Sequence, residues 1–194
     1  MRFLVTGAAG FIASNLARAL CEYGHSVVGI DSFHGYYSRS LKESNLATLI
    51  KSRTFEFKEL DILNLEKLNT KYQFDCIFHL AAQPGVRDSW GQGFDSYAMN
   101  NVLGTQKVFE FAARRNIHRV IFSSSSSIYG DAETFPTLES ANPQPRSPYG
   151  VSKLTGEYLG AAYSKKLWFR SCRASLFHCL WSGAAPRYGY KPTH

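Results

Sequence analysis

A tyrosine and a lysine four positions apart could together move a proton. Tyr149 and Lys153 open a helical pattern that continues to Tyr163, and side chains at positions i and i+4 of a helix share one face. A tyrosine with a pKa of about 10 is a poor base at neutral pH, but a nearby ammonium group favours the phenolate and lowers that pKa. Such pairs are common on helices and establish nothing alone. In a suitable fold, the pair predicts a base that takes a proton from a hydroxyl group.

Five consecutive serines, Ser123 to Ser127, directly follow the apolar segment Val120-Ile121-Phe122. Such a run could be flexible filler. Its position favours a site instead, because ligands of parallel α/β sheets bind at the carboxyl ends of the strands.

A turn with two glycines, Thr6-Gly7-Ala8-Ala9-Gly10, separates an apolar segment from a helical one. Its backbone N–H groups can approach a pyrophosphate, and the helix N-terminus adds favourable partial charge. Two glycines alone are weak evidence, but Asp31 follows twenty-one positions after Gly10. Asp31 would accept hydrogen bonds from the adenosine ribose and repel a 2′-phosphate, which predicts NAD rather than NADP. In the alternative, Asp31 merely caps a turn.

Short apolar runs alternate with helical patterns along the chain. Strands are predicted at 3–5, 26–30, 54–57, 76–80 and 120–122, and helices at 11–23, 102–115 and 149–163. This alternation is typical of βαβ units that build a parallel sheet with helices on both faces. The sequence therefore predicts an α/β fold, a Rossmann-type doubly wound parallel sheet.

In this order the motifs resemble the extended short-chain dehydrogenases of the NAD-dependent epimerase/dehydratase family. The glycine turn is similar to the family's Gly-x-x-Gly-Phe-Ile-Gly, except that Ala13 replaces the last glycine; its methyl group is expected to fit. The resemblance covers residues 1 to about 165 and is specific only as a joint match. Its other segments are Asp61-Ile62, His79-Leu80-Ala81-Ala82-Gln83, Asn100-Asn101-Val102, Ser123 to Gly130, and Ser147-Pro148-Tyr149-Gly150-Val151-Ser152-Lys153.

The resemblance implies NAD as the cofactor, and catalytic roles for Ser125, Tyr149 and Lys153. Lys153 would also hold the nicotinamide ribose, while the Tyr149 phenolate takes the proton of a sugar hydroxyl as hydride passes to NAD. No metal site is expected. The implied cofactor-binding residues are Gly7, Gly10, Phe11, Ile12, Asp31, Asp61, Ile62, Leu80, Ala81, Ala82, Gln83, Asn100, Ser123, Tyr149 and Lys153.

The residues after Ser125 bear on the reaction type. Dehydratases and decarboxylases of the family carry acidic residues there, whereas this chain has Ser126 and Ser127. The resemblance therefore implies a 4-epimerase, which oxidises C4 and returns hydride to the other face. The segment 82–87 is most similar to epimerases that act on UDP-glucuronate or UDP-glucose. A UDP-sugar is the expected partner, and a homodimer stays open.

The net charge of +7 is concentrated near the C-terminus. Residues 166–194 hold five basic and no acidic side chains, which leaves seventeen basic and fifteen acidic ones before them. The charge is thus weak evidence for a nucleic-acid partner. No apolar run reaches the roughly 18 residues of a membrane span, and residues 1–7 are typical of a first strand rather than a signal peptide. Since the four cysteines form no CxxC pair, we expect a cytoplasmic protein with no membrane partner.

After Lys165 the sequence departs from the family pattern. Residues 174–191 can be spelled with codons that, read one base later, give the family's Leu-Arg-Tyr-Phe-Thr-Val-Tyr-Gly-Pro and Arg-Pro-Asp. This predicts a frameshift near Lys165; the alternative is a genuine variant with a divergent basic end. We expect an NAD-binding Rossmann domain at 1–165, an out-of-frame tail at 166–194, and no substrate domain. The sheet would then be incomplete, with no sixth strand and an unpaired edge on the fifth.

Three functions follow from these observations. The first is an active NAD-dependent nucleotide-sugar 4-epimerase. The second is a truncated, inactive fragment that at most binds NAD. The third, a nucleic-acid binder on a Rossmann scaffold, is disfavoured because the basic charge lies in the tail.

Overall fold

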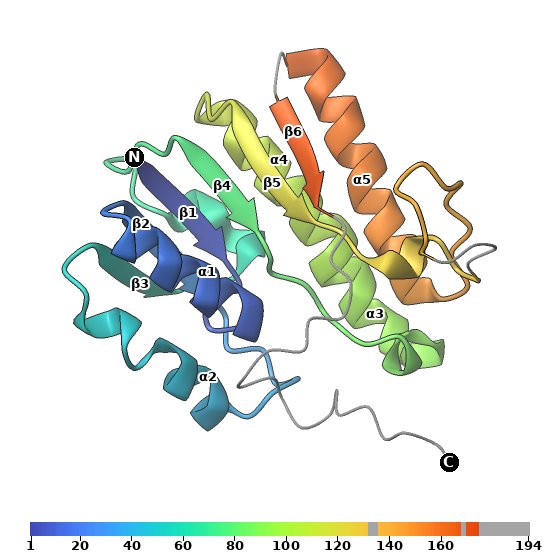
Figure 1. Ribbon diagram of the computed structural model, residues 1–194, viewed down its shortest axis with the longest axis horizontal. Coiled ribbons are helices and arrows are strands. Elements are labelled where there is room, and N and C mark those ends of the chain that lie inside the picture. The colour runs from blue at the N-terminus through green and yellow to red at the C-terminus, as the bar shows by residue number, and fades with distance from the viewer. Residues whose placement is uncertain (132–135, 168–169, 175–194) are drawn as a thin grey trace.

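A parallel sheet forms the centre of the computed structural model, which describes residues 1–131, 136–167 and 170–174. Its strand order is β3-β2-β1-β4-β5-β6 (Figure 1). The strands are β1 (Arg2–Thr6), β2 (Ser26–Asp31), β3 (Phe55–Glu59), β4 (Cys76–His79), β5 (Arg119–Ser123) and β6 (Arg170–Ala174), and all their pairings are parallel. The predicted doubly wound α/β fold is confirmed.

The helices follow the strands as the sequence predicted, with additions. They are α1 (Phe11–Glu22), α2 (Arg39–Leu46), α3 (Phe94–Tyr97), α4 (Gly104–Arg114) and α5 (Pro148–Leu167). The segment Ala98–Leu103 between α3 and α4 is π-helical. Short 3₁₀ helices lie at Leu49–Lys51, Ile62–Lys67, Arg87–Ser89, Gly91–Gly93 and Ser126–Ile128. None of the helices in the described part of the chain is both long and apolar enough to cross a membrane.

Two apolar layers cover the two faces of the sheet, because successive strand residues point to opposite sides. Leu4 packs in one cluster with Ile77 and with Val108 and Phe109 of α4. The next residue, Val5, packs in the other cluster, with residues of α1 and α2. Figure 1 shows α1 and α2 near β1 to β3, and α4 and α5 near β5 and β6.

The strand order reverses at β1, whose neighbours are β2 on one side and β4 on the other. In an open parallel sheet, the loops after the strands diverge at such a point and leave a crevice at the carboxyl ends. The turn after β1, the loop after β2 and the serine run after β5 all begin at these ends. The fold therefore brings the predicted motifs to one edge of the sheet.

The expectation that β5 keeps an unpaired edge is wrong. Strand β6 pairs with it in parallel, from Arg119 opposite Arg170 to Ser123 opposite Ala174. The prediction relied on the absence of the family's strand pattern after Lys165. Strands pair through backbone hydrogen bonds, however, and the unpaired N–H and C=O groups of an edge strand can pair with any extended segment. Helix α5 also passes the expected boundary at 165 and ends at Leu167. The division into two parts and the frameshift stay predictions.

Candidate functional site

A cavity of about 390 Å³ lies at the carboxyl ends of β1, β2, β4 and β5. Its lining includes every residue that the sequence assigned to catalysis or cofactor binding, and the roles of these residues stay proposals. They are Gly7, Gly10, Phe11, Ile12, Asp31, Asp61, Ile62, Leu80, Ala81, Ala82, Gln83, Asn100, Ser123, Ser125, Tyr149 and Lys153.

The glycine turn leaves backbone exposed to the cavity. Gly7 has a φ of +70°, and a Cβ there would lie 2.9 Å from the Cα of Ala81. Gly10 precedes α1 and has no side chain to cap it, so the first N–H groups of the helix remain available to an anion. Ala13 is buried in the cluster around Val5, and its methyl group fits as predicted. A side chain at Gly7 would therefore press on the Ala81 backbone, and a Cβ at Gly10 would lie 3.0 Å from the carbonyl oxygen of Gly7.

Asp31 is buried at the end of β2 and bound by three donors. Its Oδ1 accepts hydrogen bonds from the backbone N–H of Phe33 (2.8 Å) and the Nζ of Lys42 (2.9 Å). Its Oδ2 accepts one from the N–H of Ala9 (3.2 Å). Asp31 thus braces the local turn and also lines the cavity, so the two interpretations of this residue are compatible. The sequence did not point to Lys42, because α2 was not predicted.

The serine run contributes two hydroxyl groups, those of Ser124 and Ser125, to the cavity that Tyr149 also lines. Ser125 Oγ accepts a hydrogen bond from the N–H of Ser127 (3.2 Å), and the interaction of its hydroxyl group with Tyr149 lowers the pKa of that tyrosine. Ser124 is 4% exposed, and its Oγ has no hydrogen-bond partner within the described ranges. Ser124 and Ser125 both line the cavity, and a buried hydroxyl without a partner fits a site that binds a polar ligand.

The pKa of Tyr149 is raised, not lowered as the sequence predicted. Burial raises it most, the hydrogen bond with Ser125 lowers it, and Tyr36 raises it further. The ammonium group of Lys153 donates a 2.8 Å hydrogen bond to the carbonyl oxygen of Ser123. Of these causes, the interaction with Ser125 is the one that favours the phenolate of Tyr149.

Lys153 is a buried cation in an unfavourable environment. Its side chain is held between the Ser123 carbonyl and the ring of Phe122, whose centroid is 5.1 Å from Nζ. Burial lowers the pKa of Lys153 to about 8. A lysine with this pKa can lose or gain a proton near neutral pH.

The sequence named Asn100, but the neighbouring Asn101 makes the more extensive bonds. Asn101 accepts a hydrogen bond from the N–H of Gln83 (2.7 Å) and donates to its carbonyl and to Ser152 Oγ, both at 3.0 Å. It thereby ties the loop after β4 to α5. Asn100 lines the cavity and donates to the carbonyl of Ser96 (2.8 Å). The backbone conformation of the π-helical segment decides which asparagine bonds to Gln83 and which lines the cavity. The sequence does not reveal this conformation.

Two further side chains support the cavity wall from behind. Tyr97 is 1% exposed, donates to the carbonyls of Pro84 and Gly85, and packs edge-to-face on Tyr149 with centroids 6.1 Å apart. His79 bridges Thr6 Oγ1 (2.8 Å) and Thr105 Oγ1 (3.0 Å), and burial lowers its pKa to about 3.

The tautomer of His79 follows from its neighbours. Thr6 Oγ1 already accepts hydrogen bonds from the N–H groups of Leu80 and Ala81, so its hydroxyl proton is left to donate to His79 Nδ1. Nε2 then carries the hydrogen and donates it to Thr105. The network fixes the loop that starts at Leu80.

These parts fit a dinucleotide in order across the sheet. The bare glycine turn suits the pyrophosphate, Asp31 the adenosine ribose, and the unpartnered Ser124 hydroxyl and Lys153 lie at the β5 end. No group of three or more metal-binding side chains is found among the described residues.

Comparisons with known proteins agree with this arrangement. Residues 3–184 match the model of the NAD dependent epimerase/dehydratase family. The "Uncharacterized UDP-glucose epimerase YtcB" of Bacillus subtilis is 42% identical over 166 residues, which are 85% of this chain and 52% of that protein. The UDP-glucose 4-epimerase of Mycolicibacterium smegmatis is 40% identical over 161 residues, 81% of this chain and 49% of that protein.

A solved structure of UDP-glucuronic acid 4-epimerase from Bacillus cereus, in complex with UDP-glucuronic acid and NAD, superposes with a TM-score of 0.83 at 42% identity. The superposed part is 89% of this chain and 55% of the Bacillus cereus chain. The chain spans about half the length of the curated relatives it matches. From the family match and the motifs gathered at one cavity, the chain belongs to the NAD dependent epimerase/dehydratase family.

Proposed function

We propose that this chain binds NAD and carries the catalytic groups of a UDP-sugar 4-epimerase that acts on UDP-glucose or UDP-glucuronate. The observation that supports this most is that Ser125, Tyr149 and the buried Lys153 line the same cavity as Asp31 and the glycine turn. The names of the relatives supply the substrate class.

The chemistry divides between the cofactor and the protein. NAD supplies, when bound, an acceptor that takes a hydride and gives it back. Tyr149 takes the proton of the sugar's C4 hydroxyl and later returns it to the C4 oxygen. Ser125 hydrogen-bonds to Tyr149 and favours its phenolate, since that bond lowers the pKa of Tyr149. Lys153 holds the nicotinamide ribose with donors that the Ser123 carbonyl does not use.

Ser126 and Ser127 support epimerisation over elimination. They form the 3₁₀ turn Ser126–Ile128 directly after Ser125, where the resemblance places acidic groups in dehydratases. Without an added acid or base, C4 oxidation is followed by return of the hydride, and a return to the opposite face gives the epimer.

A second function is supported by the coverage of the relatives. Because the chain spans about half of their length, the 194 residues alone are expected to bind NAD without turning over a sugar. Positioning contributes roughly 7–11 kcal/mol in well-oriented reactions. The test is to incubate the chain with NAD and each UDP-sugar and to measure the C4 epimer by chromatography. Conversion supports an active epimerase, and NAD binding without conversion supports the inactive fragment. A chain that neither converts the sugar nor binds NAD would refute both proposals.

We infer a homodimer as a further proposal. Apolar side chains are exposed on the adjoining segments Ala98–Leu103 and α5, namely Met99, Leu103, Val151 and Tyr158. A second copy would cover this surface. Sedimentation of the wild type and of Val151→Asp tests it, and two monomeric samples at micromolar concentration would refute it.

A cytoplasmic location also stays a prediction. Cys21 and Cys76 are unpaired thiols, which supports a reducing compartment.

A further inference from the structure

Two cationic side chains lie against the same aromatic ring beside Asp31. The Cζ of Arg39 is 4.2 Å from the centroid of the Phe33 ring, and the Nζ of Lys42 is 6.0 Å from it. Phe33 in turn donates its backbone N–H to Asp31 (2.8 Å). Both cations therefore lie close to the carboxylate that we assign to the adenosine ribose.

Lys42 is the cation that lines the cavity. Its ammonium group is bound to Asp31 at 2.9 Å, and the two side chains are only 10% and 7% exposed. Asp31 already accepts three hydrogen bonds, and a carboxylate has about four acceptor sites. Asp31 alone therefore cannot accept from both ribose hydroxyls, whereas Lys42 retains donors for one of them.

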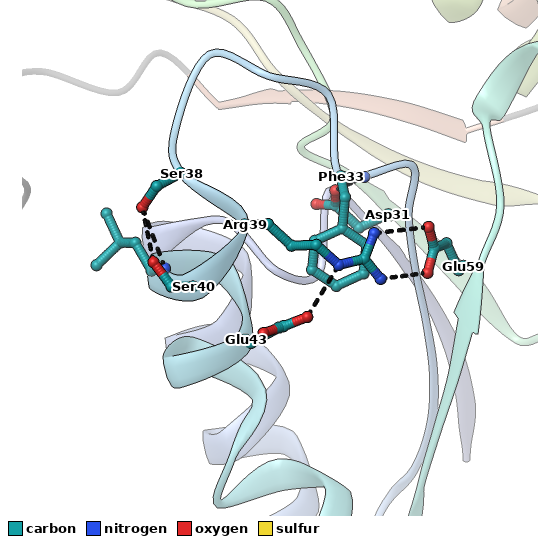
Figure 2. Close-up of polar contacts among 8 residues, drawn as sticks. Asp31, Phe33, Ser38, Arg39, Ser40, Glu43 and Glu59 are labelled. Carbon is teal, nitrogen blue, oxygen red and sulfur yellow. Dashed lines mark hydrogen bonds and ion pairs between the residues drawn. The ribbon is translucent and has the colours of Figure 1, made fainter.

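Arg39 does not line this cavity, and Figure 2 shows its guanidinium group bound by two carboxylates, those of Glu43 and Glu59. Its terminal nitrogens donate to both oxygens of Glu59, at 3.1 and 2.8 Å, and its Nε donates to Glu43 at 2.9 Å. We call Arg39, Glu43 and Glu59 the arginine clamp. A single exposed ion pair is weak, but a two-pronged pair stacked on a ring fixes the direction of the guanidinium group.

We propose that Lys42 and the arginine clamp add to the selection of NAD over NADP that Asp31 is expected to make. This inference rests on the proposed NAD site. A 2′-phosphate would be repelled by the Asp31 carboxylate. The charge of Lys42 is neutralised by Asp31, and the guanidinium group of Arg39 is paired with Glu43 and Glu59, so neither cation is available to the phosphate. Removal of the two clamp carboxylates frees a guanidinium group near the ribose, and such a group binds phosphate through two parallel hydrogen bonds.

The test measures the affinities of the 194-residue chain for NAD and NADP. In the double variant Glu43→Gln/Glu59→Gln, we expect the NAD dissociation constant to change less than about twofold and NADP to bind about tenfold more tightly. The gain should shrink as salt is added, because the freed charge is exposed. The matched control is Glu56→Gln, since Glu56 lies on β3 with Glu59 but pairs with Lys58 and Tyr72. Its affinities should match those of the wild type.

A second pair of variants tests Lys42. Lys42→Met should weaken NAD binding by about tenfold, because the ribose loses a donor. Lys42→Arg keeps a cation beside Asp31 and should restore most of the affinity. Circular dichroism of each variant separates a loss of binding from a loss of fold.

Three results would overturn the inference. They are wild-type binding of NADP as tight as NAD, unchanged NADP affinity in the double clamp variant, and unchanged NAD affinity in a folded Lys42→Met. Failure of every sample to bind NAD would instead refute the proposed cofactor site, and the inference with it.

Discussion

The ammonium group of Lys153 donates a 2.8 Å hydrogen bond to the backbone carbonyl of Ser123, the last residue of β5. This bond joins helix α5 to the start of the serine run. It also keeps a cation inside the protein, and burial lowers the pKa of Lys153 to about 8. Burial of the Lys153 charge is therefore unfavourable, and the proposed chemistry requires this same residue.

Lys153 should therefore make folding depend on alkaline pH. The unfolded chain binds this proton up to a pKa of about 10.5, whereas the folded chain releases it near 8. Between these values the unfolded state binds more protons, so the free energy of unfolding rises with pH. Relative to Lys153→Met, the wild type should gain on the order of 3 kcal/mol across this window. Urea titrations of both proteins at pH 7.5 to 10.5 measure it, and a constant difference would contradict the assigned pKa.

His79 should make folding depend on acidic pH. Its folded pKa is about 3, far below the ordinary value of about 6.5. As the pH falls through this interval, the unfolded chain takes up a proton that the folded chain rejects, so stability is lost. His79→Gln should be less stable at pH 7 by roughly 1–3 kcal/mol but should lose less stability between pH 6.5 and 4. Parallel acid titrations with equal slopes would show that His79 does not contribute.

The two adjacent asparagines should have separable effects. Asn101→Ala removes three buried hydrogen bonds and should lower the free energy of unfolding by roughly 1–3 kcal/mol. Asn100→Ala should leave stability nearly unchanged and weaken NAD binding, because Asn100 lines the cavity. Thermal unfolding and NAD titration of both variants decide this, and a reversed pattern would mean that Asn101 is the cofactor ligand.

Tyr149→Phe tests the proposed base. In a version of the protein that is extended by the C-terminal region of a full-length relative, turnover by the variant should fall by roughly 10²–10⁴-fold. NAD affinity should change little, because the substitution removes only a hydroxyl group. Near-normal turnover would remove Tyr149 from the mechanism.

Much of the fold and of the site lining could be predicted, because they depend on local signals. Apolar runs such as Cys76-Ile77-Phe78 and the turn at Gly7 carry their structure within a few residues. The motif order then places Asp31, Ser125 and Tyr149 at one edge, since parallel strands share the direction of their carboxyl ends.

The remaining features depend on contacts between distant segments. The helix with Lys42 shows no strong apolar pattern, and its pairing with Asp31 is a tertiary contact. The π-helical segment decides that Asn101, not Asn100, points to Gln83. The pKa of Tyr149 was mispredicted because the spacing shows that Lys153 shares its helix face but does not show that Tyr149 is buried, and burial raises this pKa most.

The most direct measurement of the central claim is a calorimetric titration of NAD into the 194-residue chain, into Gly7→Ala and into Gly24→Ala. Both glycines have positive φ, +70° and +78°, but only at Gly7 would a Cβ meet other atoms, the Ala81 backbone at 2.9 Å. We predict saturable binding of one NAD per chain by the wild type and by Gly24→Ala, and a loss of at least about tenfold in Gly7→Ala. The absence of saturable binding by the folded wild type, or equal binding by all three, would contradict the assignment of this cavity to NAD.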